Sequence, residues 1–184
     1  TSLHAVLDNF GERYPQFKDQ GYEVAGFVWW QGHKDGGSAA HIANYEMNLA
    51  NLIKAWRKEF NAPNMPVVVG ELGNGGPVTE GEMFEFRKAQ EDGTKQIKNA
   101  VFIKTTDFAR PAELSPCPGH GHHWFANAES YFLIGEAAGD LVVGIAPALE
   151  ALAFAHEAGQ DHGDLHAGMV LVPESGGFQL IGLG

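Results

Sequence analysis

Imidazole and thiol side chains gather in one short stretch of this chain. His120, His122 and His123 follow Cys117 closely, and imidazole and thiolate groups are ligands that zinc and nickel accept. The spacing matches no defined metal site, and the Pro and Gly residues across 111–123 are typical of a polar loop. We therefore expect no bound metal and no cofactor, with Cys117, His120 and His122 as the candidates for an adventitious ion.

Two further features allow both a binding and a structural interpretation. Trp29 and Trp30 have the side chains that stack on sugar rings, but successive side chains on a buried strand face opposite layers. We therefore expect at least one of them in the core. The glycine-rich run 73–76 has the composition of an anion-binding loop, yet no phosphate-loop lysine follows it. We expect that run to be a turn.

Strands and helices alternate along the part of the chain that carries these residues. Nearly continuous apolar runs predict buried strands, and a period of 3.6 residues predicts helices. The predicted strands cover 22–30, 66–70 and 100–104, and the predicted helices cover 3–17, 42–60, 80–96 and 127–138. This alternation favours an α/β fold with a parallel sheet and with ligands at the carboxyl ends of the strands.

Composition limits the partners of the chain. A length of 184 residues with 44% hydrophobic residues is enough for one domain with a sizeable core. The 23 acidic residues outnumber the 12 basic ones, so nucleic acid is not an expected partner. Cys117 is the single cysteine and cannot form an internal disulfide. No signal-peptide pattern or membrane-spanning run is present, so we expect a soluble protein. The sequence predicts neither its compartment nor its oligomeric state.

Two separated motifs carry a resemblance to a known family. The first is GFVWWQGHKD at 26–35, continued by Tyr45, by Asn48-Leu49, by RKEF at 57–60 and by GELG at 70–73. The second is HWFANAESY at 123–131, followed by LIGEA at 133–137. Over about residues 15–140 these motifs resemble, in order and in predicted element, the sialate O-acetylesterase family of carbohydrate esterases in the SGNH/GDSL hydrolase class.

The resemblance implies a three-layer α/β/α sandwich with a mostly parallel sheet. It also implies that a serine attacks an O-acetyl ester on a sugar, with His123 as the general base. Gln31 matches the position of an oxyanion-stabilising side chain, and Gly32 that of a close backbone approach. The implied ligand is a small acetylated carbohydrate.

The chain departs from the family pattern at three places. The family nucleophile lies in a Gly-Gln-Ser turn after the first strand, and no serine of this chain has that setting: Ser2, Ser38, Ser115, Ser130 and Ser175. The second-strand glycine loop that supplies an oxyanion donor is absent as well. Family acids are replaced by His33 and His120, leaving the acid open among Asp35, Glu71 and Asp107. We expect 1–144 to be an esterase-like domain that lacks its first strands and is inactive or weak alone.

Residues 145–184 resemble a different family. The motifs are ALEALAFAHE at 148–157, HGDLH at 162–166, VLV at 170–172 and LIGLG at 180–184. They resemble a protein-kinase catalytic-loop segment, but Gly182 and Met169 occupy the positions of both magnesium ligands. We expect a small α+β segment that packs on the first domain. The alternatives to the esterase hypothesis are a non-catalytic carbohydrate-binding or scaffold module and an inactive kinase-like fragment.

Overall fold

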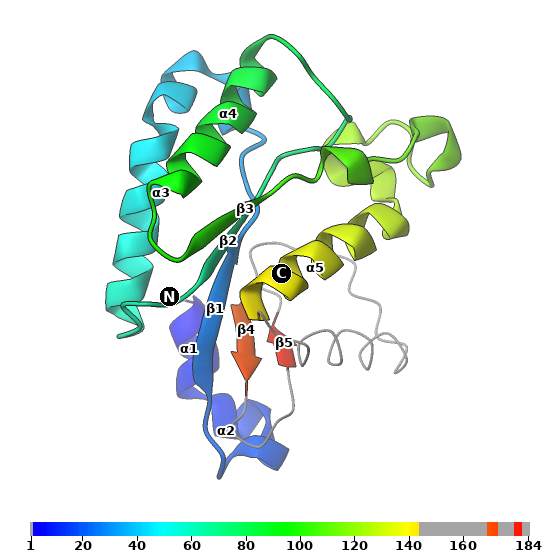
Figure 1. The fold of residues 1–184 in the computed structure, drawn as a ribbon. Helices are drawn as coiled ribbons and strands as arrows, with labels where there is room; N and C mark the ends of the chain where they lie inside the picture. Colours follow the sequence, from blue (N-terminus) through cyan, green and yellow to red (C-terminus); the bar gives the residue numbers. More distant parts are fainter. Residues whose placement is uncertain (1, 144–168, 173–178, 182–184) are drawn as a thin grey trace.

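A five-stranded sheet in the order β3-β2-β1-β4-β5 runs through the middle of the fold (Figure 1). The structure is a computed structural model that describes residues 2–143, 169–172 and 179–181. The strands are β1 (Glu23–Trp29), β2 (Val67–Gly70), β3 (Ala100–Ile103), β4 (Met169–Val172) and β5 (Gln179–Ile181). β1, β2 and β3 are mutually parallel, as predicted, and β4 and β5 extend the sheet beyond β1 as antiparallel strands. The fold is therefore α/β, with a sheet of mixed direction.

Helices cover the two faces of the parallel strands. α3 (Ala39–Glu59) and α4 (Glu82–Lys95) pack together on one face, and α5 (Ala128–Val143) contacts β1, β2 and β3. The side chains of β2 alternate accordingly, since Val67 and Val69 belong to the core cluster shared with α3 and α4, whereas Val68 is buried outside it. The described part of the chain thus has the three layers that the sequence suggested.

The period of α3 explains why this helix forms the main core face. Tyr45, Leu49 and Ile53 are four residues apart and all buried, and Lys54 and Lys58 lie on the exposed side. The Ser38 hydroxyl accepts a hydrogen bond of 3.4 Å from the amide of His41 and caps the helix. The predicted helix 42–60 is confirmed and begins one turn earlier.

The predicted helix 3–17 is wrong in its continuity. It divides into α1 (Ser2–Asp8), α2 (Phe10–Arg13) and a 3-10 turn that begins at Pro15. The Asn9 side chain donates a hydrogen bond of 2.7 Å to the carbonyl of Ala5. This bond competes with the backbone hydrogen bonds of a continuous helix at the point where α1 ends and α2 begins. Four apolar residues of this segment still form one small cluster against the end of α3: Leu3, Val6, Leu7 and Phe10.

Three loops leave the carboxyl ends of the parallel strands and meet at one edge of the sheet (Figure 1). They follow β1 at Trp30, β2 at Glu71 and β3 at Lys104. No helix among the described residues is both long enough and apolar enough to span a bilayer. The kinase-like motifs at 148–157 and 162–166 lie outside the described residues.

Candidate active site at the carboxyl edge of the sheet

The turn after β1 presents the Gln31 side chain to solvent. Gln31 is exposed, and its amide nitrogen donates a hydrogen bond of 2.8 Å to Oδ2 of Asp35. The turn closes through a 2.8 Å bond from the amide of Gly36 to the carbonyl of Gly32. An amide nitrogen carries two N–H groups. Asp35 therefore orients Gln31 while leaving a donor for a ligand.

Gly32 is required by the packing of this turn. Its φ of +151° and its burial place the backbone against Phe86 of α4, where an added Cβ would lie 2.1 Å from Cζ of the ring. Any other residue at this position would displace that ring. This packing against Phe86 gives Gly32 a structural reason, and the backbone approach to a ligand implied by the family resemblance stays a prediction.

A fully buried glutamine ties the turn after β1 to the end of β2. The Gln90 amide nitrogen donates to the carbonyls of Gly70 and Gln31 at 3.2 and 3.3 Å, and its oxygen accepts from the amide of Leu72 at 2.9 Å. Tyr45 lies beside it, and its hydroxyl donates to the Gln31 carbonyl at 3.5 Å. Burial raises the pKa of Tyr45, so the neutral phenol is favoured.

Glu71 is committed to holding two strands together. Oε2 of this buried carboxylate accepts hydrogen bonds from the amides of Thr105 and Thr106 at 2.9 and 3.0 Å and from the Thr106 hydroxyl at 2.6 Å. These bonds join the end of β2 to the residues that follow β3. They favour a structural role for Glu71 over that of a catalytic acid.

Arg87 fixes the glycine-rich run 73–76. Its guanidinium donates to the carbonyls of Leu72, Gly76 and Asn74 at 2.7, 2.8 and 3.2 Å. The amide of Gly76 also bonds to the Gly73 carbonyl at 3.0 Å, so the run is a turn, as predicted. Burial lowers the pKa of Arg87, and the Glu71 charge acts against that shift.

The loop that carries His120, His122 and His123, called the histidine loop below, covers residues 111–126 and ends in a left-handed turn. Trp124, Phe125 and Ala126 all have φ between +52° and +56°, a conformation that costs a non-glycine residue roughly 1–2 kcal/mol. The loop is held by bonds of 3.0 Å from the Phe125 amide to the His120 carbonyl and 2.9 Å from the Tyr131 hydroxyl to the His123 carbonyl. Such strain is concentrated at functional sites.

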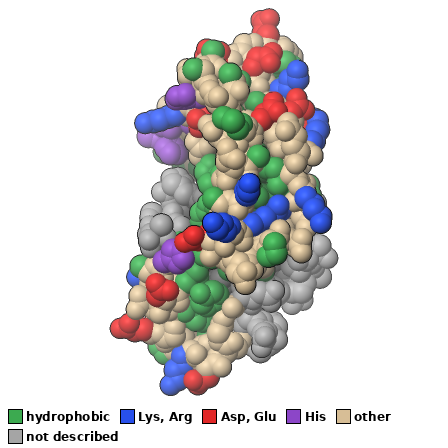
Figure 2. Space-filling view, turned by 90° about the vertical axis from the view of Figure 1, so that its left-hand side faces the viewer, with side chains coloured by type: hydrophobic (Ala, Val, Ile, Leu, Met, Phe, Trp, Pro, Cys, Tyr) green, Lys and Arg blue, Asp and Glu red, His purple; other side chains and the backbone are tan. Residues whose placement is uncertain are grey.

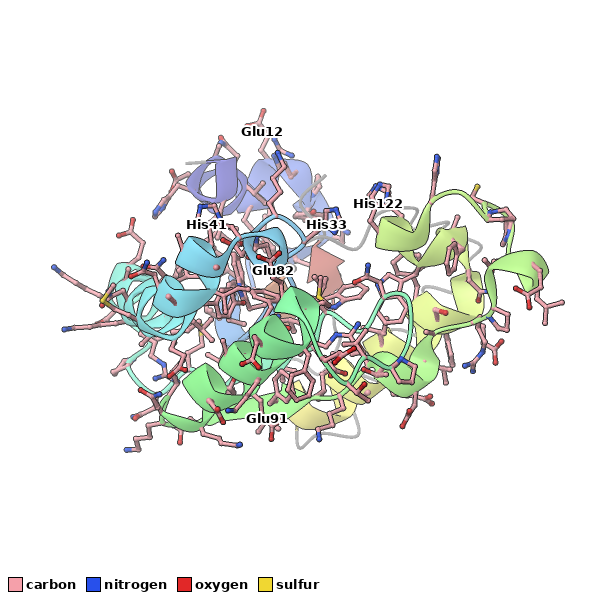
Figure 3. All side chains as sticks on the ribbon, turned by 90° about the horizontal axis from the view of Figure 1, so that it is seen from above. Glu12, His33, His41, Glu82, Glu91 and His122 are labelled. Carbon is pink, nitrogen blue, oxygen red and sulfur yellow. The ribbon has the colours of Figure 1, made fainter. Side chains whose placement is uncertain are left out.

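The turn after β1 and the histidine loop meet at the carboxyl edge of the sheet. The rings of His33 and His122 stack with centroids 5.4 Å apart (Figure 3). Behind them, Trp30 packs on Trp124 at 5.7 Å. The Asn74 amide nitrogen also reaches the Gly121 carbonyl at 3.5 Å. Gln31 lies two residues before His33 and His123 directly follows His122, so both lie at the same edge of the sheet.

His123 itself is exposed, and its ring packs on His122 at 4.3 Å. Among the described side chains, no carboxylate lies in ion-pair range of the His123 ring. Asp35 instead faces Gln31 and the ring of His41, whose Nδ1 is 3.7 Å from Oδ1. Asp107 is exposed in the 3-10 turn after β3. The structure therefore brings the loops that carry Gln31 and His123 together, and none of the described carboxylates pairs with His123.

The described serine hydroxyls serve local structure. Ser38 caps α3, Ser115 donates to the Pro111 carbonyl at 2.8 Å, and Ser130 donates to the Phe108 carbonyl at 2.7 Å. The side chains of Ser2 and Ser175 lie outside the described residues. The described part of the chain contains no group of three or more His, Cys, Asp or Glu side chains placed to hold a metal ion, and this applies also to Cys117, His120 and His122.

Both tryptophans are used in packing contacts. Trp29 packs on Phe27 at 6.0 Å and donates to the Tyr45 hydroxyl at 3.2 Å. Trp30 donates to the Glu71 carbonyl at 3.0 Å and packs on Trp124. The structural interpretation therefore applies to both rings.

Sequence reasoning missed the two polar residues that build this edge. Gln90 and Arg87 lie on the predicted helix 80–96, and both are buried. One signal was present in the sequence. The glycine run 73–76 exposes backbone carbonyls that need donors, and Arg87 is the nearby side chain with several N–H groups.

A comparison with models of known protein families shows where this chain belongs. Residues 7–131 match the family model described as carbohydrate esterase, sialic acid-specific acetylesterase. Searches of curated proteins and of solved structures found no significant match. The matched range contains β1 to β3 and ends within α5.

Proposed function

Because this chain belongs to the sialic acid-specific acetylesterase family of carbohydrate esterases, we propose that its carboxyl-edge site takes part in hydrolysis of O-acetyl esters on sugars. The supporting observation is the contact of His33 with His122, which brings the Gln31 turn and the histidine loop together. In this proposal the described residues supply the base and one oxyanion donor. The proposal also needs a serine nucleophile. In the family this serine lies in a Gly-Gln-Ser turn, and no serine of the given sequence lies in such a turn.

His123 is the proposed general base. Its exposed imidazole takes the proton of the serine hydroxyl as the serine oxygen attacks the acetyl carbonyl, and later protonates the leaving sugar oxygen. Water then attacks the acetyl-enzyme, His123 takes its proton, and acetate leaves as the serine hydroxyl re-forms. The bond from Tyr131 to the His123 carbonyl fixes the backbone that carries this ring.

Gln31 is the proposed oxyanion donor. Its second amide N–H is directed by the bond to Asp35 and stabilises the negative charge that develops on the carbonyl oxygen. Asp35 is therefore assigned to positioning Gln31. Of the three candidate acids, Glu71 fits least, because Oε2 already accepts three hydrogen bonds.

A direct test measures acetyl release by the chain as it stands. We expect no burst with 4-nitrophenyl acetate and no covalent adduct after treatment with a serine-directed fluorophosphonate, measured by intact mass. General-base help to water alone is worth roughly 10²–10⁴-fold, far below a complete esterase. His123→Ala removes that residual rate, whereas His4→Ala on α1 is the matched control. One adduct mass together with saturable turnover would show that a serine of this chain is the nucleophile, and Ser38→Ala would then be the first variant.

A second candidate function is sugar binding without hydrolysis. It is favoured by the engagement of Ser38, Ser115 and Ser130 in local hydrogen bonds. Binding of an O-acetylated sugar, lost on Gln31→Ala and accompanied by no acetate release, would support this function over the first.

A further inference from the structure

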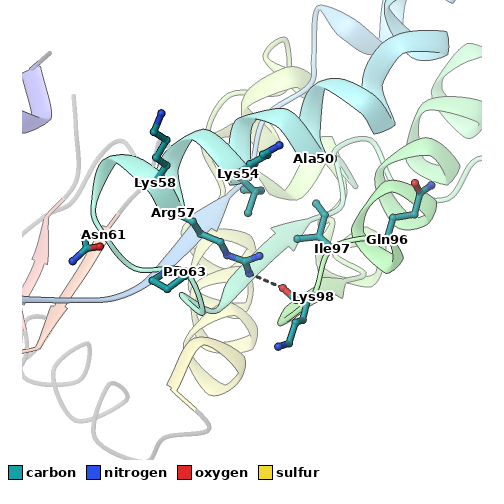
Figure 4. Close-up of a pocket in the computed structure, with 10 residues that line it drawn as sticks. Ala50, Lys54, Arg57, Lys58, Asn61, Pro63, Gln96, Ile97 and Lys98 are labelled. Atoms are coloured by element: carbon teal, nitrogen blue, oxygen red, sulfur yellow. Dashed lines mark hydrogen bonds between the residues drawn. The ribbon is translucent and has the colours of Figure 1, made fainter.

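A second hollow lies at the other end of the parallel strands. It has a volume of about 560 Å³ and lies between the last turns of α3 and the residues that lead into β3 (Figure 4). Its walls come from 50–63 and 96–98, which precede β2 and β3. The hollow is therefore at the amino ends of these strands, whereas the esterase-like site is at their carboxyl ends. Its volume lies within the range of small-molecule pockets.

The charge of this hollow is opposite to that of the chain. Lys54, Arg57, Lys58 and Lys98 line it, and no acidic residue does. These are four of the 12 basic residues of a chain with net charge −11. Lys and Arg side chains gather midway along this face of the molecule (Figure 2). Such a local concentration of positive charge attracts anions that the rest of the surface repels.

Among the side chains that the structure describes, no carboxylate forms an ion pair with any of these four cations. Lys95, Lys104 and Arg110 elsewhere do pair with carboxylates. The lysines of the hollow are exposed and free to turn toward a ligand.

Arg57 is the fixed member of the group. Its guanidinium donates to the Met65 carbonyl at 2.8 and 3.1 Å and to the Lys98 carbonyl at 2.6 Å (Figure 4). These partners are neutral, and desolvation lowers the pKa of Arg57. A half-buried cation without an anion is left electrostatically uncompensated. A bound oxyanion would supply that compensation.

We propose that this hollow binds an anionic sugar, with its carboxylate or phosphate among Lys54, Arg57 and Lys98. The Gln96 amide nitrogen already donates a hydrogen bond of 2.6 Å to Oε2 of Glu46, so its oxygen and the amide group of Asn61 offer hydrogen bonds to ring hydroxyls. Ile97 offers an apolar contact for a ring face. The basic side chains of the hollow support an anionic group in the ligand, whereas the inference that the ligand is a sugar rests on the proposed function. The acidic surface of the chain opposes long polyanions, so the ligand is a single charged sugar unit.

The test is calorimetric titration with glucuronic acid, glucose 6-phosphate, glucose and inorganic phosphate. We expect both acidic sugars to bind at least about tenfold more tightly than glucose, since charge-assisted hydrogen bonds are the strong ones. Lys54→Gln/Lys98→Gln should weaken that binding by about tenfold. Lys18→Gln/Lys88→Gln removes the same charge from exposed positions outside the hollow and should leave it unchanged.

Three outcomes would overturn the proposal. Equal weakening by the two double variants would show that only net charge matters. Binding of inorganic phosphate as tight as that of glucose 6-phosphate would leave an ion site with no role for the sugar. Equal affinity for glucose and the acidic sugars would remove the anion from recognition. His123→Ala separates the two proposals, because it should leave this binding intact whatever happens to ester hydrolysis.

Discussion

Two parts of the carboxyl edge are stabilised in different ways. The turns after β1 and β2 are held by buried polar side chains, with Gln90 and Arg87 each bonding several backbone groups. The histidine loop is held by backbone bonds, by the Trp30–Trp124 contact and by the Tyr131 hydroxyl, and it contains three left-handed residues. The turns after β1 and β2, called the frame below, are thus fixed by buried hydrogen bonds, whereas the histidine loop is exposed and contains strained backbone.

This difference matches the proposed chemistry. An oxyanion donor acts by being preorganised, which a buried frame provides for Gln31. A general base must reach both the nucleophile and the leaving group, which an exposed ring such as His123 can do. The comparison predicts that substitutions in the frame cost stability, whereas substitutions in the loop change stability little or raise it.

The largest expected effect comes from Gln90→Leu. This change leaves the Leu72 amide and the Gly70 carbonyl without their side-chain partner in the core, and we expect a loss of about 3 kcal/mol or more in unfolding free energy. Urea denaturation followed by fluorescence measures it. Gln96→Leu, at an exposed position just after the same helix, is the control and should cost less than about 1 kcal/mol. Equal losses would show that the buried network is not the stabilising part.

Gly32→Ala is expected to have the next largest effect. The new methyl group would overlap the Phe86 ring, and the overpacking should cost about 2 kcal/mol. Gly37→Ala, in the same connection but with nothing within 4 Å of the added carbon, should be close to neutral. Unfolding curves of the two variants check this, and a stable Gly32→Ala protein would contradict the packing of this turn.

The sequence predicted the helices and strands better than the tertiary contacts and hydrogen bonds that join them. The strands and α3 follow from apolar runs and a clear helical period, and the meeting of the two motifs follows from the parallel sheet. The left-handed turn at Trp124 could not be predicted, because tryptophan has no preference for positive φ. Tertiary contacts impose that turn. The antiparallel placement of β4 and β5 likewise depends on pairing partners distant in sequence.

Ala126→Gly tests the strain of the histidine loop. Ala126 is exposed with φ of +55°, and glycine adopts this conformation without steric cost. After the entropy cost of glycine, we expect a gain of about 0.5–1 kcal/mol in thermal or urea unfolding. Ala128→Gly, at the start of α5, should lower stability by up to about 1 kcal/mol. If Ala126→Gly also destabilises the protein, the loop is not under backbone strain.

The smallest effect concerns alkaline pH and the frame. Burial raises the pKa of Tyr45 above its ordinary value of 10.0, so the folded state holds the phenol proton more tightly than the unfolded state does. The stability due to this difference is fully present below pH 10 and is lost as the pH rises toward the folded-state pKa. Urea unfolding at pH 8 and at several values above pH 10 should therefore show a steeper loss for the wild-type chain than for Tyr45→Phe. The variant itself starts from a lower stability, because the Trp29 N–H and the Gln31 carbonyl lose a partner. Parallel pH profiles for the two proteins would mean that Tyr45 titrates as if exposed, and the frame around Gln31 would then be open to water.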